Sequence, residues 1–193
     1  VFPPPNSLLS FSKLKIGEIM CKENHKAMGT GKVLGLSEVV KGVFHLVVDI
    51  SEMNVCPQAG QFFMLKAEKS NVFLTRPISI YKIDKTEGKL KIHFLILQLG
   101  KGTKELCEME VGKSITLTGP LGNGFSAPAS NEKVAIIGGG IGVAPVAGFA
   151  STLEEKSYDF FACFKSGSYG IGDVKANKLF ITTDDGSVGV KGM

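Results

Sequence analysis

A glycine-rich stretch, residues 138–142, follows a continuous apolar run and precedes a proline. The run from Val134 to Ile137 suits a parallel strand buried on both faces, and glycines let backbone approach a ligand closely. Pro145 stands where a helix can start, because a first-turn proline gives up no hydrogen bond. Free N–H groups and the helix dipole favour phosphate at such a strand–turn–helix unit. The stretch therefore predicts a nucleotide pyrophosphate site at Gly138, Gly139, Gly140, Ile141 and Gly142.

The spacing of these glycines departs from the strict dinucleotide fingerprint G-x-G-x-x-G. Counted from Gly138, the last glycine of that pattern would fall at Val143. Glycine-rich turns after a strand also occur simply to reverse the chain. On spacing alone, nucleotide binding and a plain turn are about equally favoured.

Two further motifs carry groups that bind anions. Arg76 opens an apolar strand, where its guanidinium can pair bidentately with phosphate, and Ser79 adds a hydroxyl. Gly102 and the glycine two residues before it can expose backbone N–H groups as an anion nest, with the Thr103 hydroxyl beside them. The plainer alternatives, a surface arginine and a tight turn, are favoured when each motif is taken alone.

A polar segment, residues 182–187, lies where a parallel strand is expected to end, and open sheets bind ligands there. Its adjacent residues Asp184 and Asp185 could form a catalytic pair or a magnesium site, but turn-forming Asp and Gly favour a loop cap. The chain has no G-x-S-x-G elbow, P-loop or H-E-x-x-H motif. Any chemistry is therefore expected to reside in a bound cofactor.

The secondary structure that holds these residues begins at about Ala27. From there, short runs of β-branched and apolar residues alternate with turn signals, which predicts a small antiparallel six-stranded barrel. A short helix is expected at residues 104–109. The expected strands are residues 32–39, 42–50, 61–67, 78–83, 89–97 and 114–118.

Beyond a loop-like stretch, residues 119–131, strand and helix alternate, which predicts a parallel sheet with right-handed crossovers. Strands are expected at 134–137, 160–164 and 179–182, and a helix at 146–155. The predicted domains are an N-terminal arm (1–26), a β-barrel (27–126) and an α/β nucleotide-binding domain (132–193). That last domain is short for a doubly wound sheet, so we expect it to be truncated.

Bulk properties describe an ordinary globular chain, with 44% hydrophobic and 21% charged residues among 193. The net charge of +4 comes without an aromatic-plus-basic cluster, so no nucleic-acid partner is expected. No apolar run approaches the roughly 20 residues that span a bilayer, so no membrane partner is expected. The 4 cysteines form no C-x-x-C pair, which disfavours a metal site and favours reduced thiols in a cytoplasmic protein.

In this order, the motifs resemble the ferredoxin–NADP reductase superfamily, and within it the electron-transfer subunits of dihydroorotate dehydrogenase, an enzyme of pyrimidine biosynthesis. The resemblance runs from about residue 27 to residue 193. Each motif alone is weak, but the ordered set is specific. It comprises residues 59–62, 76–80, 100–103, 119–125, 138–145 and 183–189.

The resemblance implies an oxidoreductase with FAD on the barrel and NAD(P)H on the second domain, assembled with a catalytic dehydrogenase subunit. NADH would pass hydride to the flavin, which would release electrons singly. Arg76 would hold the FAD pyrophosphate, Ser79 would sit near flavin N5, and residues 95–97 would line the flavin. The implied cofactor-binding residues are Arg76, Pro77, Ile78, Ser79, Leu95, Ile96, Leu97, Gly102, Thr103, Gly138, Gly139, Gly140, Ile141 and Gly142.

The sequence also departs from that family. Its members bind a two-iron, two-sulfur cluster through a cysteine-rich C-terminal segment, and no cysteine here has that spacing. Phe164 is followed by Lys165 and Ser166, which leaves NADH and NADPH both open, although the family favours NADH. Two alternatives stay open: a subunit of a sulfide dehydrogenase or ferredoxin:NADP oxidoreductase, and a non-catalytic interaction module on the same fold.

Overall fold

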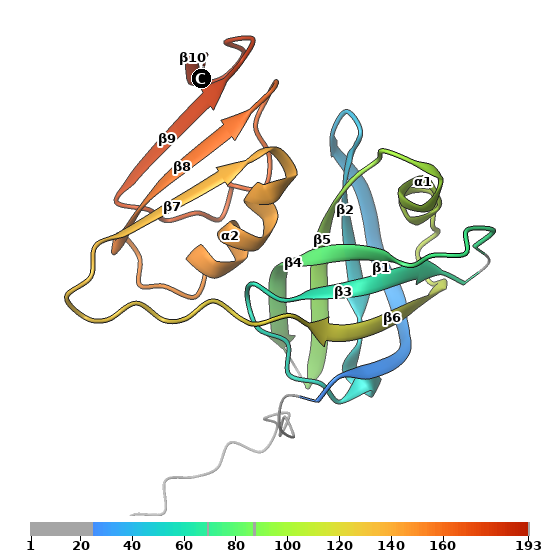
Figure 1. The fold of residues 1–193 in the computed structure, drawn as a ribbon. Helices are drawn as coiled ribbons and strands as arrows, with labels where there is room; N and C mark the ends of the chain where they lie inside the picture. Colours follow the sequence, from blue (N-terminus) through green and yellow to red (C-terminus); the bar gives the residue numbers. More distant parts are fainter. Residues whose placement is uncertain (1–24, 69, 87, 193) are drawn as a thin grey trace, which may run out of the picture.

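The computed structural model describes residues 25–68, 70–86 and 88–192. The expected N-terminal arm lies outside these ranges except for His25 and Lys26. Figure 1 shows a barrel joined to a separate sheet. The barrel is closed, with strand order β1-β2-β5-β4-β3-β6 and antiparallel neighbours throughout. Its strands are β1 (Ala27–Val40), β2 (Val43–Asp49), β3 (Phe62–Ala67), β4 (Arg76–Thr86), β5 (Lys89–Leu97) and β6 (Ser114–Leu121).

The six-stranded barrel is confirmed, but β1, β4 and β6 are longer than predicted. β1 starts at Ala27, because Ala27 to Lys32 pair with Gly119 to Ser114 of β6. β6 accordingly runs to Leu121, into the stretch expected to be a loop. The first residues of β1 could not be predicted as a strand, because they include glycines. At Gly31 a Cβ would lie 2.5 Å from Val48 Cγ1, so only glycine allows this close packing.

Alternate residues of the strands fill the barrel, as the period of two requires. Leu46, Val48, Ile92 and Phe94 are fully buried in this core. The short helix α1 (Lys101–Cys107) covers the core with Leu106 and Cys107, and the 3-10 helix η1 (Ser51–Met53) adds Met53. The helix was predicted at 104–109 and begins three residues earlier, where the Thr103 hydroxyl caps its first turn.

The second part is a four-stranded parallel sheet with the order β10-β9-β8-β7. Its strands are β7 (Val134–Gly139), β8 (Tyr158–Phe164), β9 (Lys178–Thr183) and β10 (Val190–Lys191). The 3-10 helix η2 (Gly140–Gly142) and the helix α2 (Val143–Ala150) follow β7. The parallel sheet is therefore confirmed, and the two-residue strand β10 was not predicted.

Helix α2 occupies Val143–Ala150 rather than the predicted 146–155. Pro145 lies in its first turn, where the missing N–H has no helical partner to lose. The helix ends early because the hydroxyls of Ser151 and Thr152 donate to the carbonyls of Gly148 and Phe149, both at 2.7 Å. The helix was predicted too long because apolar residues at helical spacing continue past its last residue, Ala150.

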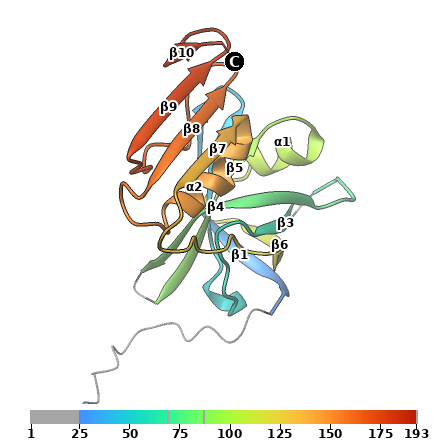
Figure 2. The ribbon, with the colours of Figure 1, turned by 60° about the vertical axis from the view of Figure 1, so that its left-hand side comes forward.

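Helix α2 lies between the sheet and the barrel (Figures 1 and 2). A Cβ at Gly148 would be 2.5 Å from the carbonyl oxygen of Tyr81 in β4, so the helix backbone contacts the barrel directly. Lys82 Nζ and Asp173 Oδ2 form an ion pair at 2.7 Å across the same junction. The Phe125 and Phe149 rings also meet there, with centroids 4.9 Å apart. These contacts fix the sheet part against the outer face of the barrel.

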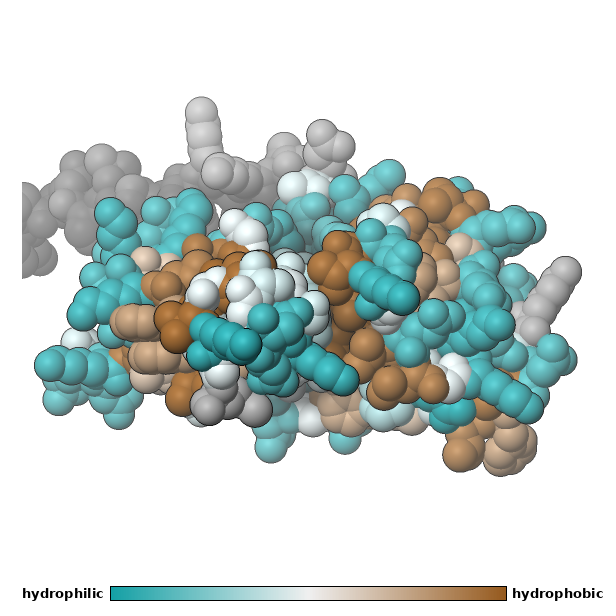
Figure 3. Space-filling model, turned by 90° about the horizontal axis from the view of Figure 1, so that it is seen from above, coloured by the Kyte–Doolittle hydropathy of each residue, from teal (hydrophilic) through white to brown (hydrophobic). Residues whose placement is uncertain are grey.

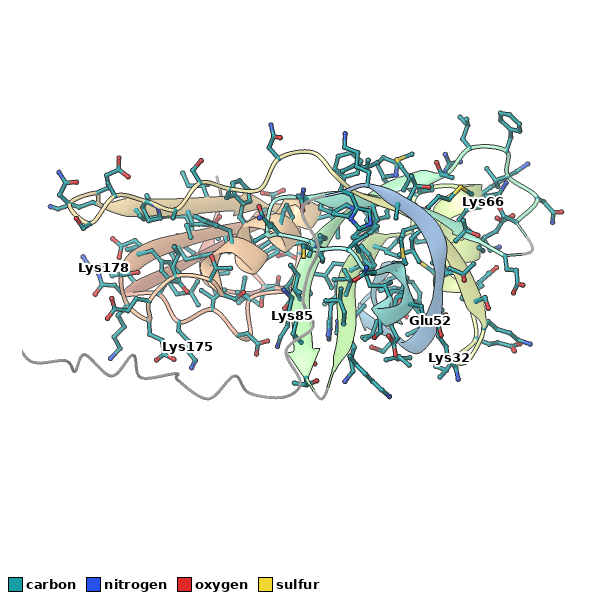
Figure 4. All side chains as sticks on the ribbon, turned by 90° about the horizontal axis from the view of Figure 1, so that it is seen from below. Lys32, Glu52, Lys66, Lys85, Lys175 and Lys178 are labelled. Carbon is teal, nitrogen blue, oxygen red and sulfur yellow. The ribbon has the colours of Figure 1, made fainter. Side chains whose placement is uncertain are left out.

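The charged side chains are spread over both parts of the molecule. The labelled residues Lys32, Lys66, Lys85, Lys175 and Lys178 lie apart from one another in Figure 4. Figure 3 shows hydrophobic side chains exposed in separate patches among hydrophilic ones. Within the described ranges, no helix is long and apolar enough to cross a membrane.

The expectation of reduced thiols is only partly met. Cys107 and Cys163 are free, whereas Cys56 is disulfide-bonded. Spacing along the chain cannot show which cysteines approach each other in space, so the sequence offered no sign of this bond.

A half-buried histidine pair lies on the outer face of the barrel near the sheet part. His45 Nε2 and His93 Nδ1 are 2.9 Å apart, and the His45 ring meets Tyr81 edge-on at 5.8 Å. Burial lowers the pKa of His93 to about 4, with smaller contributions from His45 and Lys82, and burial also lowers the pKa of His45. Asp84, Lys91 and Asp173 are the other charged groups acting on the pair. Both imidazoles are therefore neutral at pH 7.

This pair predicts loss of stability on acidification. Unfolded histidine takes up a proton near pH 6.5, while folded His93 resists protonation down to about pH 4. The free energy of unfolding should therefore fall as the pH drops from 6.5 to 4. Urea denaturation across this range should show a shallower fall in His93→Gln than in the wild type. Equal slopes in the two proteins would contradict this assignment.

Candidate cofactor-binding site

Arg76 and Gly102, from two separate sequence motifs, are in direct contact. Arg76 is the first residue of β4, and Gly102 lies in the first turn of α1. A Cβ at Gly102 would lie 2.2 Å from Arg76 Nε and 2.9 Å from its Cζ. The guanidinium therefore rests on the first turn of the helix, in space that any other residue type at position 102 would fill.

Thr103 uses its side chain to cap that helix. Its Oγ1 accepts hydrogen bonds from the N–H groups of Leu99 at 2.9 Å and Gly100 at 3.1 Å, and donates to the Gly100 carbonyl at 3.0 Å. The first-turn N–H groups of a helix have no partner within the helix, and its dipole favours an anion there. The geometry thus gives the Thr103 hydroxyl a structural role and leaves backbone N–H groups to meet a ligand.

The predicted strand motifs divide between the two faces of the barrel wall. Ile78 and Ile80 pack with the core, so the alternation of β4 turns Pro77 and Ser79 outward. Ile96 is likewise fully buried in the core, which turns Leu95 and Leu97 outward on β5. The structure therefore brings Ser79, Leu95 and Leu97 to the outer face, whereas the side chains of Ile78 and Ile96 support the wall from inside.

The glycines of the β7–α2 turn have different roles. A Cβ at Gly138 would be 2.8 Å from Val146 Cγ2, so this residue lets α2 pack on the strand. Gly140 adopts a φ of +51°, which L residues rarely adopt. At Gly139 and Gly142 a Cβ would meet nothing within 4 Å. Gly138 thus allows close packing, and Gly140 sets the direction of the turn. The turn has free space at Gly139 and Gly142, beside the half-buried Ile141.

The turn and the outer face of the barrel meet at one point. A Cβ at Gly170 would lie 2.7 Å from Leu95 Cδ1 of β5 and 3.2 Å from Val143 Cγ1, at the start of α2. The neighbouring Tyr169 hydroxyl would be 3.9 Å from a Cβ at Gly140. The two groups of predicted site residues therefore adjoin, although more than 40 residues separate Leu95 from Gly138 in the sequence.

Residues 183–188 form a hydrogen-bonded loop, as the plainer interpretation expected. Hydrogen bonds from the Ser187 side chain and from the Ser187 N–H, which lies 2.9 Å from Asp185 Oδ1, lower the pKa of Asp185 to about 2. Thr183 Oγ1 bonds to the backbone of Val188. Among the described residues, no group of three or more His, Cys, Asp or Glu is placed to hold a metal ion.

The chain is similar to one family model and to known sequences. Residues 36–125 match the family model described as an oxidoreductase FAD-binding domain. The dihydroorotate dehydrogenase B (NAD(+)) electron transfer subunit of Clostridium acetobutylicum is 42% identical over 163 residues, covering 83% of this chain and 63% of that protein. The subunit of the same name from Clostridium perfringens is 34% identical over 168 residues, covering 84% and 65%. The chain thus spans less than two thirds of the length of these relatives.

Solved structures share the fold. The structure of an NADH-dependent reduced ferredoxin-NADP oxidoreductase matches with a TM-score of 0.67 and 23% identity, covering 84% of this chain and 59% of that one. The ferredoxin reductase in carbazole 1,9a-dioxygenase matches with a TM-score of 0.71 and 19% identity, covering 89% and 56%. Residues 36–125 thus match an oxidoreductase FAD-binding domain, the chain is similar in sequence to dihydroorotate dehydrogenase B electron transfer subunits, and it shares the fold of the two reductase structures.

Proposed function

We propose that this chain binds FAD on its barrel, oxidises NADH and delivers electrons to a catalytic dihydroorotate dehydrogenase subunit. In this proposal it acts in the cytoplasm, in pyrimidine biosynthesis, as one subunit of a hetero-oligomer. The names of its relatives support the activity and the partner. The observation that carries the proposal is the Arg76 guanidinium resting on the first turn of α1.

The Arg76–Gly102 contact fits the diphosphate of FAD. A guanidinium binds phosphate oxygens through paired, charge-assisted hydrogen bonds, and the free N–H groups of a helix start bind the same kind of oxygen. Both sets of donors lie together only because Gly102 lacks a side chain. Arg76, Gly102 and the backbone of Thr103 would therefore hold the diphosphate.

The outer face of β4 and β5 fits a flat ring. Leu97 offers apolar contact there and Ser79 offers a hydroxyl at the edge, while Leu95, which is buried against Gly170, supports this surface from beneath. Bound FAD would supply the hydride acceptance and single-electron release that protein side chains cannot. The part of these three residues is to orient the ring and keep water from it.

The turn of residues 139–142 fits the dinucleotide of NADH, since it is open at Gly139 and Gly142 and starts a helix. The relatives' name specifies NAD(+), which supports NADH over NADPH. Reacting atoms must come within about 3–3.5 Å for efficient transfer. The Gly148–Tyr81 contact and the Lys82–Asp173 ion pair would hold the turn at a fixed place against the barrel.

Replacing Arg76 should weaken FAD binding. A charge-assisted hydrogen bond contributes about 1.5–3 kcal/mol, so Arg76→Ala should raise the dissociation constant by roughly 10- to 150-fold. Arg76→Lys keeps the charge without the planar fork and should fall between. Fluorescence titration of the apoprotein with FAD measures all three proteins. Equal affinity in the wild type and Arg76→Ala would refute this role.

A side chain at Gly140 should impair reduction by NADH while leaving FAD binding intact. Valine is strained at a φ of +51° and would displace the turn, and a shift of about 1 Å costs roughly 10²-fold in rate. Stopped-flow absorbance of the FAD-loaded protein measures the rate. The control is Gly42→Val, which strains a hairpin at a φ of +79° with no neighbour within 4 Å. Equal rates in the two variants would count against a nucleotide site at this turn.

A further inference from the structure

Glu105 ties helix α1 to the segment that leads into β4. The Asn71 N–H donates to Glu105 Oε1 at 3.2 Å, and the Ser70 hydroxyl donates to Oε2. Both oxygens of this half-buried carboxylate are therefore engaged by one segment. The described part of that segment is residues 70–75, and Arg76 follows it directly as the first residue of β4.

Gly102 and Glu105 are three residues apart on α1 and so lie on the same face of the helix. Gly102 receives the Arg76 side chain, while Glu105 holds the segment's first residues. Helix α1 thus contacts the start of the segment before β4 and also Arg76, which follows the segment. Arg76 carries the guanidinium that would bind the FAD diphosphate.

Apolar packing does little to hold this segment in place. Phe73 is 91% exposed and Leu74 is 63% exposed, so their side chains contribute little burial energy. Ser70 links the Glu105 carboxylate to the segment, because its hydroxyl also accepts from the Val72 N–H at 3.1 Å. Its own N–H donates to the Ala67 carbonyl at the end of β3, also at 3.1 Å. Polar contacts through Ser70 and Glu105 therefore order the approach to Arg76.

We propose that Glu105 is a positioning residue for Arg76. Glu105 places the Arg76 guanidinium on the first turn of α1, where the guanidinium can bind a diphosphate. This inference rests on the proposed function, because the diphosphate is that of FAD. The charge of Glu105 and its positioning role predict opposite changes in FAD affinity when Glu105 is replaced. By charge alone, removing a carboxylate near an anion site should tighten anion binding, whereas loss of a positioning contact should weaken it.

Two substitutions separate these effects. Glu105→Ala removes both acceptors and should raise the FAD dissociation constant about tenfold, the scale of a hydrogen bond to a charged group. Glu105→Gln removes the charge but keeps an acceptor for Asn71, and should stay within about twofold of the wild type. The matched control is Glu108→Ala, three residues further along at the C-cap of α1, where an exposed carboxylate pairs with Lys104 at 3.7 Å. Its FAD affinity should equal that of the wild type.

A double-mutant cycle with Arg76 completes the test. If Glu105 acts through Arg76, adding Glu105→Ala to Arg76→Ala should cause no further loss of FAD affinity. Additive losses, an unchanged affinity in Glu105→Ala, or tighter binding in both Glu105 variants would overturn the positioning role. If the wild-type apoprotein itself binds no FAD in the same titration, the proposed function fails instead.

Discussion

Close approach at glycine residues governs both halves of the candidate site. At Gly102 the missing side chain leaves space in which the Arg76 guanidinium rests. At Gly148 it lets the backbone of α2 reach the carbonyl of Tyr81, where a Cβ would lie only 2.5 Å away. A larger residue at either position would separate groups that the proposed chemistry needs together. The chain therefore uses these two glycines to build contacts rather than to gain flexibility.

The barrel supplies a rigid wall on which this arrangement can be precise. Its fully buried core residues lock alternate positions of β4 and β5 inward, which turns Ser79, Leu95 and Leu97 outward. Helix α2 and residues 169–173 then bring the glycine turn against that wall, as Figure 2 shows for the helix. Two proposed binding places far apart in the sequence thereby adjoin, which is the geometry that transfer between two flat cofactors requires.

Much of the fold follows from local pattern, because strands of a barrel repeat every two residues and are separated by turn residues. The six barrel strands and the parallel sheet could be predicted in this way. The pattern failed where a distant strand or a local side-chain hydrogen bond decides the structure. The glycine-containing start of β1 is a strand only because β6 pairs with it. Helix α2 stops early because Ser151 and Thr152 bond back to its carbonyls.

For the candidate site too, the sequence predicted residue types but not the contacts between them. Its anion-binding motifs could be read from residue types, but their contact at Gly102 could not. The sequence also pointed to residues 95–97 as a group, while strand alternation places Ile96 in the core. The Glu105 tie and the His45–His93 pair escaped prediction, because nothing local marks a partner 34 or 48 residues away.

In the proposed function, one molecule places a flavin and a nicotinamide side by side. The decisive experiment is an anaerobic titration of the FAD-loaded wild-type protein with NADH, followed by the flavin's visible absorbance. We expect the protein to bind FAD and to lose its visible band with about one equivalent of NADH per flavin, because a bound flavin accepts one hydride. If the protein binds FAD but its visible band stays unchanged under excess NADH, the two cofactors do not meet as proposed.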